Sequence, residues 1–165
     1  MTRRRSIAFL FLGETLLIPH LYPIVEALAA ADSTVAIDLW VSTSVHERLL
    51  RRWTALLDAP GIVIRRAPGF RRDDGDEVGR NPVLPSKLPM LFRLAPRLAR
   101  TPVVVCAEQT SLWLPRLMPW RATRYVKTSH GVGSMSARDD PRRRAAFHTL
   151  VPSEQERETY LKRGI

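Results

Sequence analysis

The sequence predicts an α/β fold built on a doubly wound parallel sheet, and three observations lead to this class. Strand and helix patterns alternate along the whole chain without an internal repeat, as parallel strands joined by helical crossovers require. The first strand pattern, Ile7–Leu12, is continuously apolar, which is typical of a strand covered on both faces. The 165 residues, of which 45% are hydrophobic and 25% charged, suffice for a single Rossmann-like domain with its own core.

The first half of the chain contains three strand patterns and two helix patterns. Gly13-Glu14 ends the first strand, and apolar residues spaced for one helix face follow, with Pro23 expected in the first turn. The next strand is rich in β-branched residues, and Ser44 with Glu47 forms a capping-box pattern before the second helix. The expected elements are a strand at Ile7–Leu12, a helix at Pro19–Ala31, a strand at Thr34–Val41, a helix from Ser44 to Leu57 and a strand at Ile62–Arg66.

The second half of the chain is less regular. Phe70–Pro85 is polar, charged and interrupted by Gly and Pro, so we expect a long flexible loop there. Two prolines inside the next helix pattern predict a kink or a break. The remaining elements are expected at Leu88–Leu98 (helix), Thr101–Ala107 (strand), Ser111–Leu117 (short apolar segment), Arg124–Thr128 (strand), Arg138–Arg144 (basic loop), Phe147–Val151 (strand) and from the cap at Ser153 to a stop at Gly164 (helix).

The chain carries a net charge of +10, from 26 Lys and Arg against 16 Asp and Glu. Such an excess favours polyanionic partners, namely nucleic acid, an anionic membrane face or phosphate-bearing substrates. Nucleic acid is the least favoured partner, because the chain has no nucleic-acid-binding motif and no aromatic pairs interleaved with its basic residues. We interpret the short arginine clusters as solvated faces, with docking on anionic lipid headgroups as the alternative.

The single cysteine, Cys106, lies in an apolar strand pattern and is interpreted as an unreactive core residue. One cysteine excludes an internal disulfide framework and suits a reducing compartment. The spacing of a zinc site is absent, so we expect neither a metal nor another cofactor. No apolar run approaches the roughly 20 residues that cross a bilayer. We therefore expect a cytoplasmic protein, with peripheral contact to the inner membrane face as an option.

The segment Val126–Ser136 passes from a strand pattern into small residues around one histidine. Gly131 and Gly133 permit positive φ and close approach of a ligand, and a loop leaving a buried strand offers free N–H groups to an anion. His130 is the residue in this segment that can hold or release a proton near neutral pH. The segment indicates either a substrate-binding loop with a catalytic histidine or a tight turn with a surface histidine.

Ligands of doubly wound sheets bind outside the carboxyl ends of the strands. The residues that follow the predicted strands therefore become site candidates. The candidate bases are His130, Glu14 and His20, and the candidate substrate-binding residues are Gly13, Glu108, Ser129, Gly131 and Gly133. The alternatives are that Glu14 serves the positive end of the next helix, and that His20 packs beside Tyr22. Glu108 is also a candidate partner for a histidine, whereas His46 and His148 are interpreted as surface or core residues without a role.

Two local motifs resemble the N-terminal half of a GT-B glycosyltransferase. His20-Leu21-Tyr22-Pro23 is similar to the His-x-x-Pro that follows the first strand in many of these enzymes. Gly13-Glu14, followed after an insertion by the segment from Pro23 to Leu28, resembles the start of the Kdo-transferase domain. In that family this glutamate is the catalytic base, so the resemblance implies that role for Glu14.

The closest local resemblance covers about Val103 to Gly133 and is to the CDP-glycerol glycerophosphotransferases. Leu112-Trp113-Leu114-Pro115, a basic spacer and then the strand into Ser129-His130-Gly131 carry it. The family has a Trp-His-Gly-Thr motif at this point, and its histidine is taken as the base, which implies that role for His130. Here Ser129 replaces the Trp and Val132 replaces the Thr. Leu150 to Gly164 resembles the end of a GT-B first domain.

These resemblances imply a transferase domain that works without a metal. We expect residues 1–165 to form the acceptor-side half of a GT-B fold, with the donor-binding domain and its second histidine absent from the chain. The implied partners are a nucleotide-sugar or CDP-glycerol donor and a glycan or lipid-linked acceptor of the cell envelope. We expect the isolated chain to fold without turning over substrate. The alternative is a non-catalytic basic module that binds an anionic membrane or nucleic acid.

Overall fold

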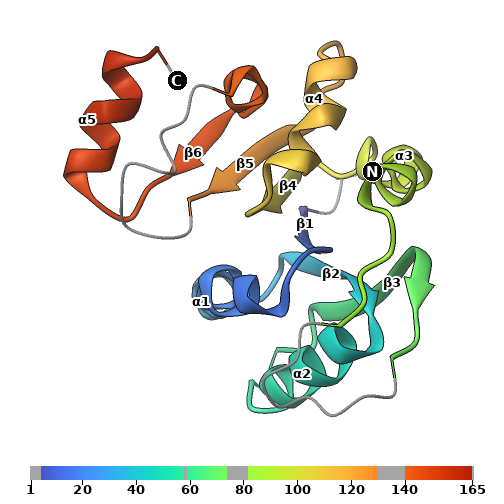
Figure 1. The fold of residues 1–165 in the computed structure, drawn as a ribbon. Coiled ribbons are helices and arrows are strands. Elements are labelled where there is room, and N and C mark those ends of the chain that lie inside the picture. The colour runs from blue at the N-terminus through green and yellow to red at the C-terminus, as the bar shows by residue number, and fades with distance from the viewer. Residues whose placement is uncertain (1–4, 58, 74–81, 130–139, 165) are drawn as a thin grey trace.

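The computed structural model describes residues 5–57, 59–73, 82–129 and 140–164, and it contains a six-stranded parallel sheet (Figure 1). The strand order is β3-β2-β1-β4-β5-β6, which confirms the doubly wound α/β class. The order reverses between β1 and β4, and this is the point where such sheets leave a crevice for ligands. The strands are β1 (Ser6–Phe11), β2 (Ala36–Thr43), β3 (Ile62–Arg71), β4 (Val103–Cys106), β5 (Arg124–Thr128) and β6 (His148–Leu150).

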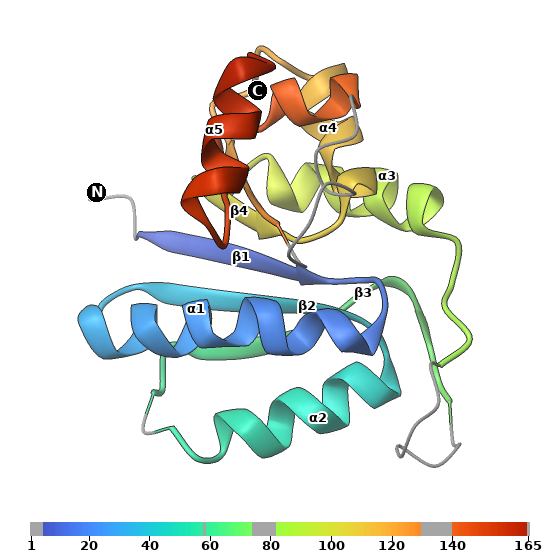
Figure 2. The ribbon, with the colours of Figure 1, turned by 60° about the vertical axis from the view of Figure 1, so that its left-hand side comes forward.

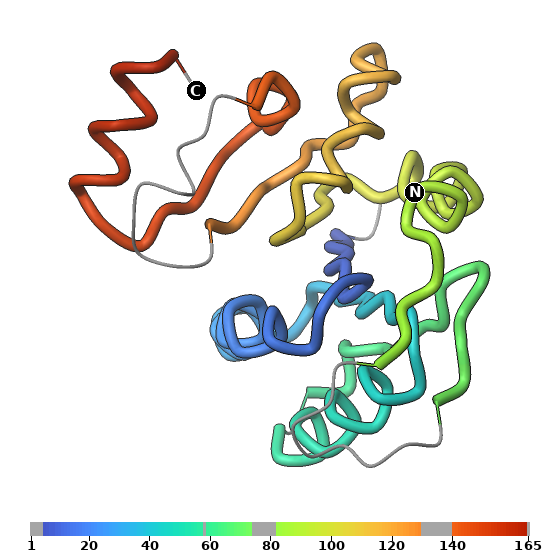
Figure 3. The backbone as a smooth tube through the Cα atoms, viewed as in Figure 1, coloured from blue at the N-terminus to red at the C-terminus, as the bar shows by residue number. Residues whose placement is uncertain are grey.

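Helices cover both faces of the sheet. In Figure 2, α1 and α2 lie together on one face and α3 on the other, while α5 lies beyond the edge strand β6 in Figure 1. The backbone crosses from the α2 side to the opposite face between β3 and β4 (Figure 3). The helical elements are η1 (Thr15–Leu17), α1 (Ile18–Ala31), α2 (Ser44–Thr54), α3 (Lys87–Leu98), η2 (Gln109–Leu112), α4 (Trp113–Leu117), η3 (Pro141–Ala145) and α5 (Glu154–Lys162). None of the helices in the described ranges is long and apolar enough to span a membrane.

Two apolar clusters, one on each face, hold the layers together. Successive side chains of β1 point to opposite faces, so Ala8 and Leu10 pack with α3 and α4, whereas Phe9 and Phe11 pack with α1 and α2. This burial on both sides explains why the strand pattern is continuously apolar. Cys106 is fully buried in the first cluster, which confirms a core residue, and burial raises the pKa of its thiol to about 12.

Several predicted element boundaries are corrected by the structure. Helix α1 starts at Ile18, so Pro23 lies inside the helix and not in its first turn. Of the kink or break expected within Leu88–Leu98, the break is wrong, because Lys87–Leu98 forms one helix that contains Pro96 near its end, and the kink stays a prediction. The cap of α2 is Thr43, one residue earlier than predicted, since the Thr43 side chain accepts the N–H of the residue three positions on.

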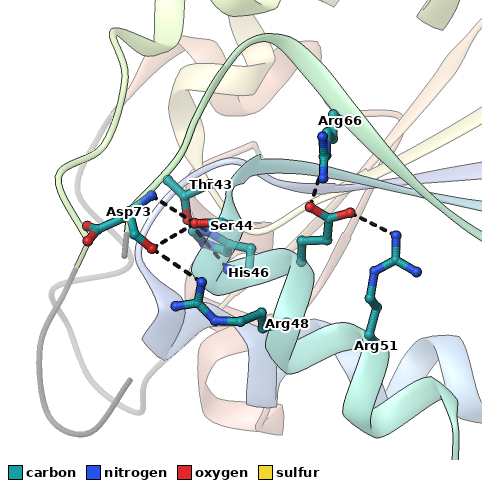
Figure 4. A network of polar contacts seen from close by, with 8 residues as sticks. Thr43, Ser44, His46, Arg48, Arg51, Arg66 and Asp73 are labelled. Atoms are coloured by element: carbon teal, nitrogen blue, oxygen red, sulfur yellow. Dashed lines mark hydrogen bonds and ion pairs between the residues drawn. The ribbon is translucent and has the colours of Figure 1, made fainter. Parts of the chain in front are cut away.

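The loop predicted over Phe70–Pro85 begins later than expected. Phe70 and Arg71 extend β3, and residues 74–81 lie outside the described residues, so the predicted flexibility of that part stays a prediction. Asp73 is held at the carboxyl edge of the sheet. Its N–H donates to Ser44 Oγ at 2.8 Å, and its carbonyl accepts from Ser44 Oγ at 2.8 Å and from Arg48 Nη1 at 3.2 Å (Figure 4).

Candidate functional site

Gly13 and Glu108 meet at the switch point of the sheet. Gly13 follows β1 and Glu108 follows β4, and these neighbouring strands are paired in parallel. Gly13 is buried, and a Cβ added to it would lie 1.7 Å from Oε1 of Glu108. The missing side chain of Gly13 is therefore what lets the Glu108 carboxylate approach the main chain of the β1–α1 connection. Two residues that the sequence assigned to substrate binding are in contact here.

Lys87, the first residue of α3, holds the Glu108 carboxylate. Its Nζ donates to Glu108 Oε1 at 2.5 Å, and the two side chains are 29% and 13% exposed. Among the described residues, the hydrogen-bond partner of Glu108 is this lysine and not a histidine as predicted. The pair is sheltered from water, so its geometry is better defined than that of an exposed ion pair.

His46 is the third residue of α2 and is fully buried. Its Nδ1 lies 2.7 Å from Thr43 Oγ1, and that hydroxyl also accepts the His46 N–H, so it can donate to Nδ1 (Figure 4). In this arrangement the proton of the neutral ring sits on the buried Nε2, and the main chain of Gly13 is the polar group beside the ring. Burial lowers the pKa of His46 to about 4, the main chain of Gly13 opposes this shift, and the charge of Lys87 adds to it. The imidazole is thus neutral at pH 7.

Helix α2 is fastened to β3 by a second charged group. Glu47 Oε1 accepts from Arg51 Nη2 at 2.8 Å and Oε2 accepts from Arg66 Nε at 2.9 Å (Figure 4). Burial raises the pKa of Glu47, but the hydrogen bonds and charges of the two arginines outweigh it and lower the pKa overall. Glu47 is therefore not the partner of Ser44 in a capping box, and it fixes the start of α2 at the site.

The two alternative bases that the structure describes are both exposed. Glu14 precedes η1, where its main-chain carbonyl accepts the Leu17 N–H at 3.0 Å and its side chain makes no cap hydrogen bond. His20 is the third residue of α1 and is also exposed, while the neighbouring Tyr22 is buried with its ring 5.0 Å from that of Trp53.

Ser129 connects β5 to α5. Its hydroxyl donates to Glu156 Oε1 at 2.6 Å, and its N–H donates to the Leu150 carbonyl at 2.7 Å. Ser153 caps α5 as predicted, because its Oγ accepts the Glu156 N–H at 3.2 Å. The other predicted residues of this loop, His130, Gly131 and Gly133, lie outside the described residues, so their roles stay predictions.

A buried polar cluster lies beside this connection. Lys127 is 3% exposed, and its Nζ donates to the Thr128 carbonyl at 3.2 Å. Burial and the charge of Arg143 lower the pKa of Lys127, against the opposing charges that include Glu156. Arg143 is itself buried and donates to the Tyr160 hydroxyl. This cluster joins β5, η3 and α5 into one unit.

Sequence reasoning did not find Lys87, His46 or Lys127. A signal for His46 was present, because a helix cap directly after a strand places the first helical turn at the ligand edge of a parallel sheet. Lys87 follows a long irregular segment whose path the sequence does not define. Its contact with Glu108 therefore could not be predicted from the sequence. Lys127 lies in a strand pattern that marks its position but not its burial.

No protein-family model and no curated protein sequence matches this chain. Among solved structures, a protein assigned as a UDP-N-acetylglucosamine 2-epimerase from Listeria monocytogenes has a TM-score of 0.59 and 15% identity, over 99% of this chain and 43% of that one. A sucrose-phosphate synthase chain from Thermosynechococcus elongatus has a TM-score of 0.51 and 21% identity, over 96% of this chain and 82% of that one.

The likeness to these structures is one of fold. It supports a Rossmann-like domain of the GT-B type, and it does not extend to the CDP-glycerol group in particular. This chain spans 43% of the epimerase-assigned structure, which is less than half of its length. At these identities, donor, acceptor and catalytic base do not follow from the likeness.

Proposed function

We propose that this chain is the acceptor-side domain of a transferase that moves a glycosyl or glycerophosphate group from a nucleotide-activated donor to a cell-envelope polysaccharide or lipid-linked acceptor. The GT-B-type fold supports this proposal at the level of architecture. The nucleotide-activated donor is proposed to bind to a second domain, as it does in the GT-B enzymes that the sequence resembles.

One observation carries the proposal: four segments bring polar groups to the switch point of the sheet. Glu108 contacts Gly13 and is held by Lys87, with the neutral ring of His46 beside them. A carboxylate fixed by an ion pair can accept a hydrogen bond from an acceptor hydroxyl and orient it for attack. The lysine places a positive charge where a phosphate-bearing substrate would approach.

The proton of the attacking hydroxyl needs a base, and His130 is the residue we assign to that role. A histidine near its unperturbed pKa of about 6.5 is suited to accept a proton at neutral pH. The rival assignment is Glu14, which the Kdo-transferase resemblance favours and which is exposed at the same edge. Glu108 is proposed as a positioning residue for the acceptor in either case.

The test uses the full-length gene product with radiolabelled CDP-glycerol or UDP-sugars and a membrane fraction as the acceptor source. We expect transfer from one donor class, and an approximately 10²-fold lower kcat/KM in Glu108→Gln, because the neutral amide replaces the carboxylate and removes its ion pair with Lys87. Glu26→Gln is the matched control, since Glu26 is an exposed residue of α1. Full activity in Glu108→Gln would remove Glu108 from the mechanism.

A non-catalytic binding module remains the second candidate, because the net charge of +10 favours polyanions. The two candidates differ in their dependence on a donor. Binding to RNA or DNA with a steep salt dependence, and no transfer from any activated donor, would favour the module. Donor-dependent transfer at physiological salt would favour the enzyme.

A further inference from the structure

A cavity of about 700 Å³ opens at the amino-terminal edge of the sheet, far along the strands from the candidate functional site. It lies between α4, the start of β5 and η3. Arg124 begins β5, and Phe147 immediately precedes β6, so both mark this edge. Among the described residues, four arginines line the cavity, which we call the arginine pocket: Arg116, Arg121, Arg124 and Arg144. None of the lining residues that the structure describes is acidic.

The charges of the arginine pocket are not compensated within the described part of the chain. None of its four arginines forms an ion pair with a described carboxylate. Two of them lie over aromatic rings, Arg124 at 4.5 Å from the centroid of Phe147 and Arg116 at 5.4 Å from that of Trp113. Like charges around one concavity repel each other, and a bound anion relieves that repulsion.

Large apolar side chains stand exposed beside the pocket. Trp120 is 72% exposed, Phe147 51% and Leu117 46%. Leu117 is the last residue of α4, and Trp120 lies in the segment that connects α4 to β5 and also supplies Arg121. Exposed aromatic and aliphatic side chains next to unpaired cations are typical of surfaces that rest on the headgroup region of a membrane.

We propose that the arginine pocket docks the amino-terminal edge of the sheet on an anionic membrane by binding the phosphate headgroups of acidic phospholipids. The arginines would contact the phosphates, and Trp120 and Leu117 would enter the interfacial layer. A soluble phosphate ester would use the same cations but would leave those two side chains in water. The site lies at the edge opposite Glu108, so its test does not depend on the proposed transferase activity.

The test is co-sedimentation of the 165-residue chain with vesicles of phosphatidylcholine, with and without phosphatidylglycerol. We expect binding that requires phosphatidylglycerol and weakens as salt rises. Arg121→Gln/Arg144→Gln should weaken it by about 30-fold, at roughly fivefold per cation. Arg71→Gln/Arg72→Gln is the matched control. It removes two exposed arginines at the carboxyl end of β3, at the edge of the sheet opposite the arginine pocket. It should weaken binding less than about threefold.

Trp120→Ser leaves the net charge unchanged, so it does not alter attraction by charge alone. If Trp120 enters the interfacial layer, this variant should also weaken vesicle binding. Circular dichroism and urea unfolding verify that each variant is folded. Equal losses in the two arginine double variants would overturn the proposal in favour of diffuse charge attraction. Absence of binding to phosphatidylglycerol vesicles would also overturn it, as would binding to glycerol phosphate or RNA that leaves vesicle binding undetected.

Discussion

The candidate functional site and the arginine pocket, at opposite edges of the sheet, differ in whether their charges are paired. At the carboxyl edge, cations are joined to carboxylates: Lys87 to Glu108 at 2.5 Å, and Arg66 to Glu47 at 2.9 Å. At the amino edge, the arginine pocket gathers four cations that have no described carboxylate partner. Paired and sheltered charges hold side chains in fixed positions, whereas unpaired exposed charges attract something from outside the chain. This difference in pairing is why we propose chemistry at the first site and membrane association at the second.

The largest effect expected at the carboxyl edge is on catalysis. His130→Ala in the full-length protein should lower kcat by about 10²–10⁴-fold, because a general base contributes by that amount when its pKa is near the working pH. Transfer assays under saturating donor measure this. Glu14→Gln and His20→Ala are the comparison variants, since each removes a rival base. If Glu14→Gln abolished transfer and His130→Ala did not, the base would be Glu14.

The next effect concerns the pH dependence of stability. The pKa of His46 is lowered from 6.5 to about 4, so the unfolded chain binds a proton between these values that the folded chain does not. The shifted pKa of His46 contributes about 3 kcal/mol to the free energy of unfolding. This contribution is fully present above pH 6.5 and is lost as the pH falls toward 4. Urea unfolding at several pH values measures this slope.

A His46→Gln variant supplies the control for that slope. It lacks the titrating ring, so its free energy of unfolding should decrease less than that of the parent between pH 6.5 and pH 4. Equal slopes in the two proteins would mean that His46 does not stay neutral in the fold. His148→Gln, which removes an exposed histidine of β6, should leave the slope as it is.

A smaller effect is expected at the Gly13 contact. Gly13→Ala places a methyl group 1.7 Å from the present position of Glu108 Oε1, so the carboxylate must move away from Lys87. We expect a loss of about 1–2 kcal/mol in the free energy of unfolding, the cost of disturbing a sheltered, charge-assisted hydrogen bond. In a Glu108→Ala background the same change should cost much less. Additive losses in the two backgrounds would show that the contact is not the cause.

The smallest effect is expected at the amino edge. Arg121→Gln/Arg144→Gln should change the free energy of unfolding by less than about 0.5 kcal/mol, because both side chains are exposed and have no described partner to lose. Lys87→Met, at the carboxyl edge, removes the partner of the partly buried Glu108 and should cost more. A marked destabilisation by the arginine changes would mean that the pocket serves the fold itself.

Much of the fold was predictable from local patterns. The strand at Arg124–Thr128 and the cap at Ser153 were predicted as the structure has them, because hydrophobic period and side-chain capping act within a few residues. The errors occurred where a local rule had two outcomes. Pro96 was tolerated near the end of α3, and Thr43 took the cap expected of Ser44.

By itself, the sequence determined the parallel sheet, the apolar strands and the placement of Gly13 and Glu108 after two of them. Only the tertiary structure decided that these two residues touch, and that Lys87 and His46 join them. The same holds for the arginine pocket, whose members come from α4, the segment after it, β5 and η3. The physical reason is that a residue's type and its neighbours set its local conformation, whereas burial, ion pairing and unpaired charge depend on which distant segments the packed sheet brings together.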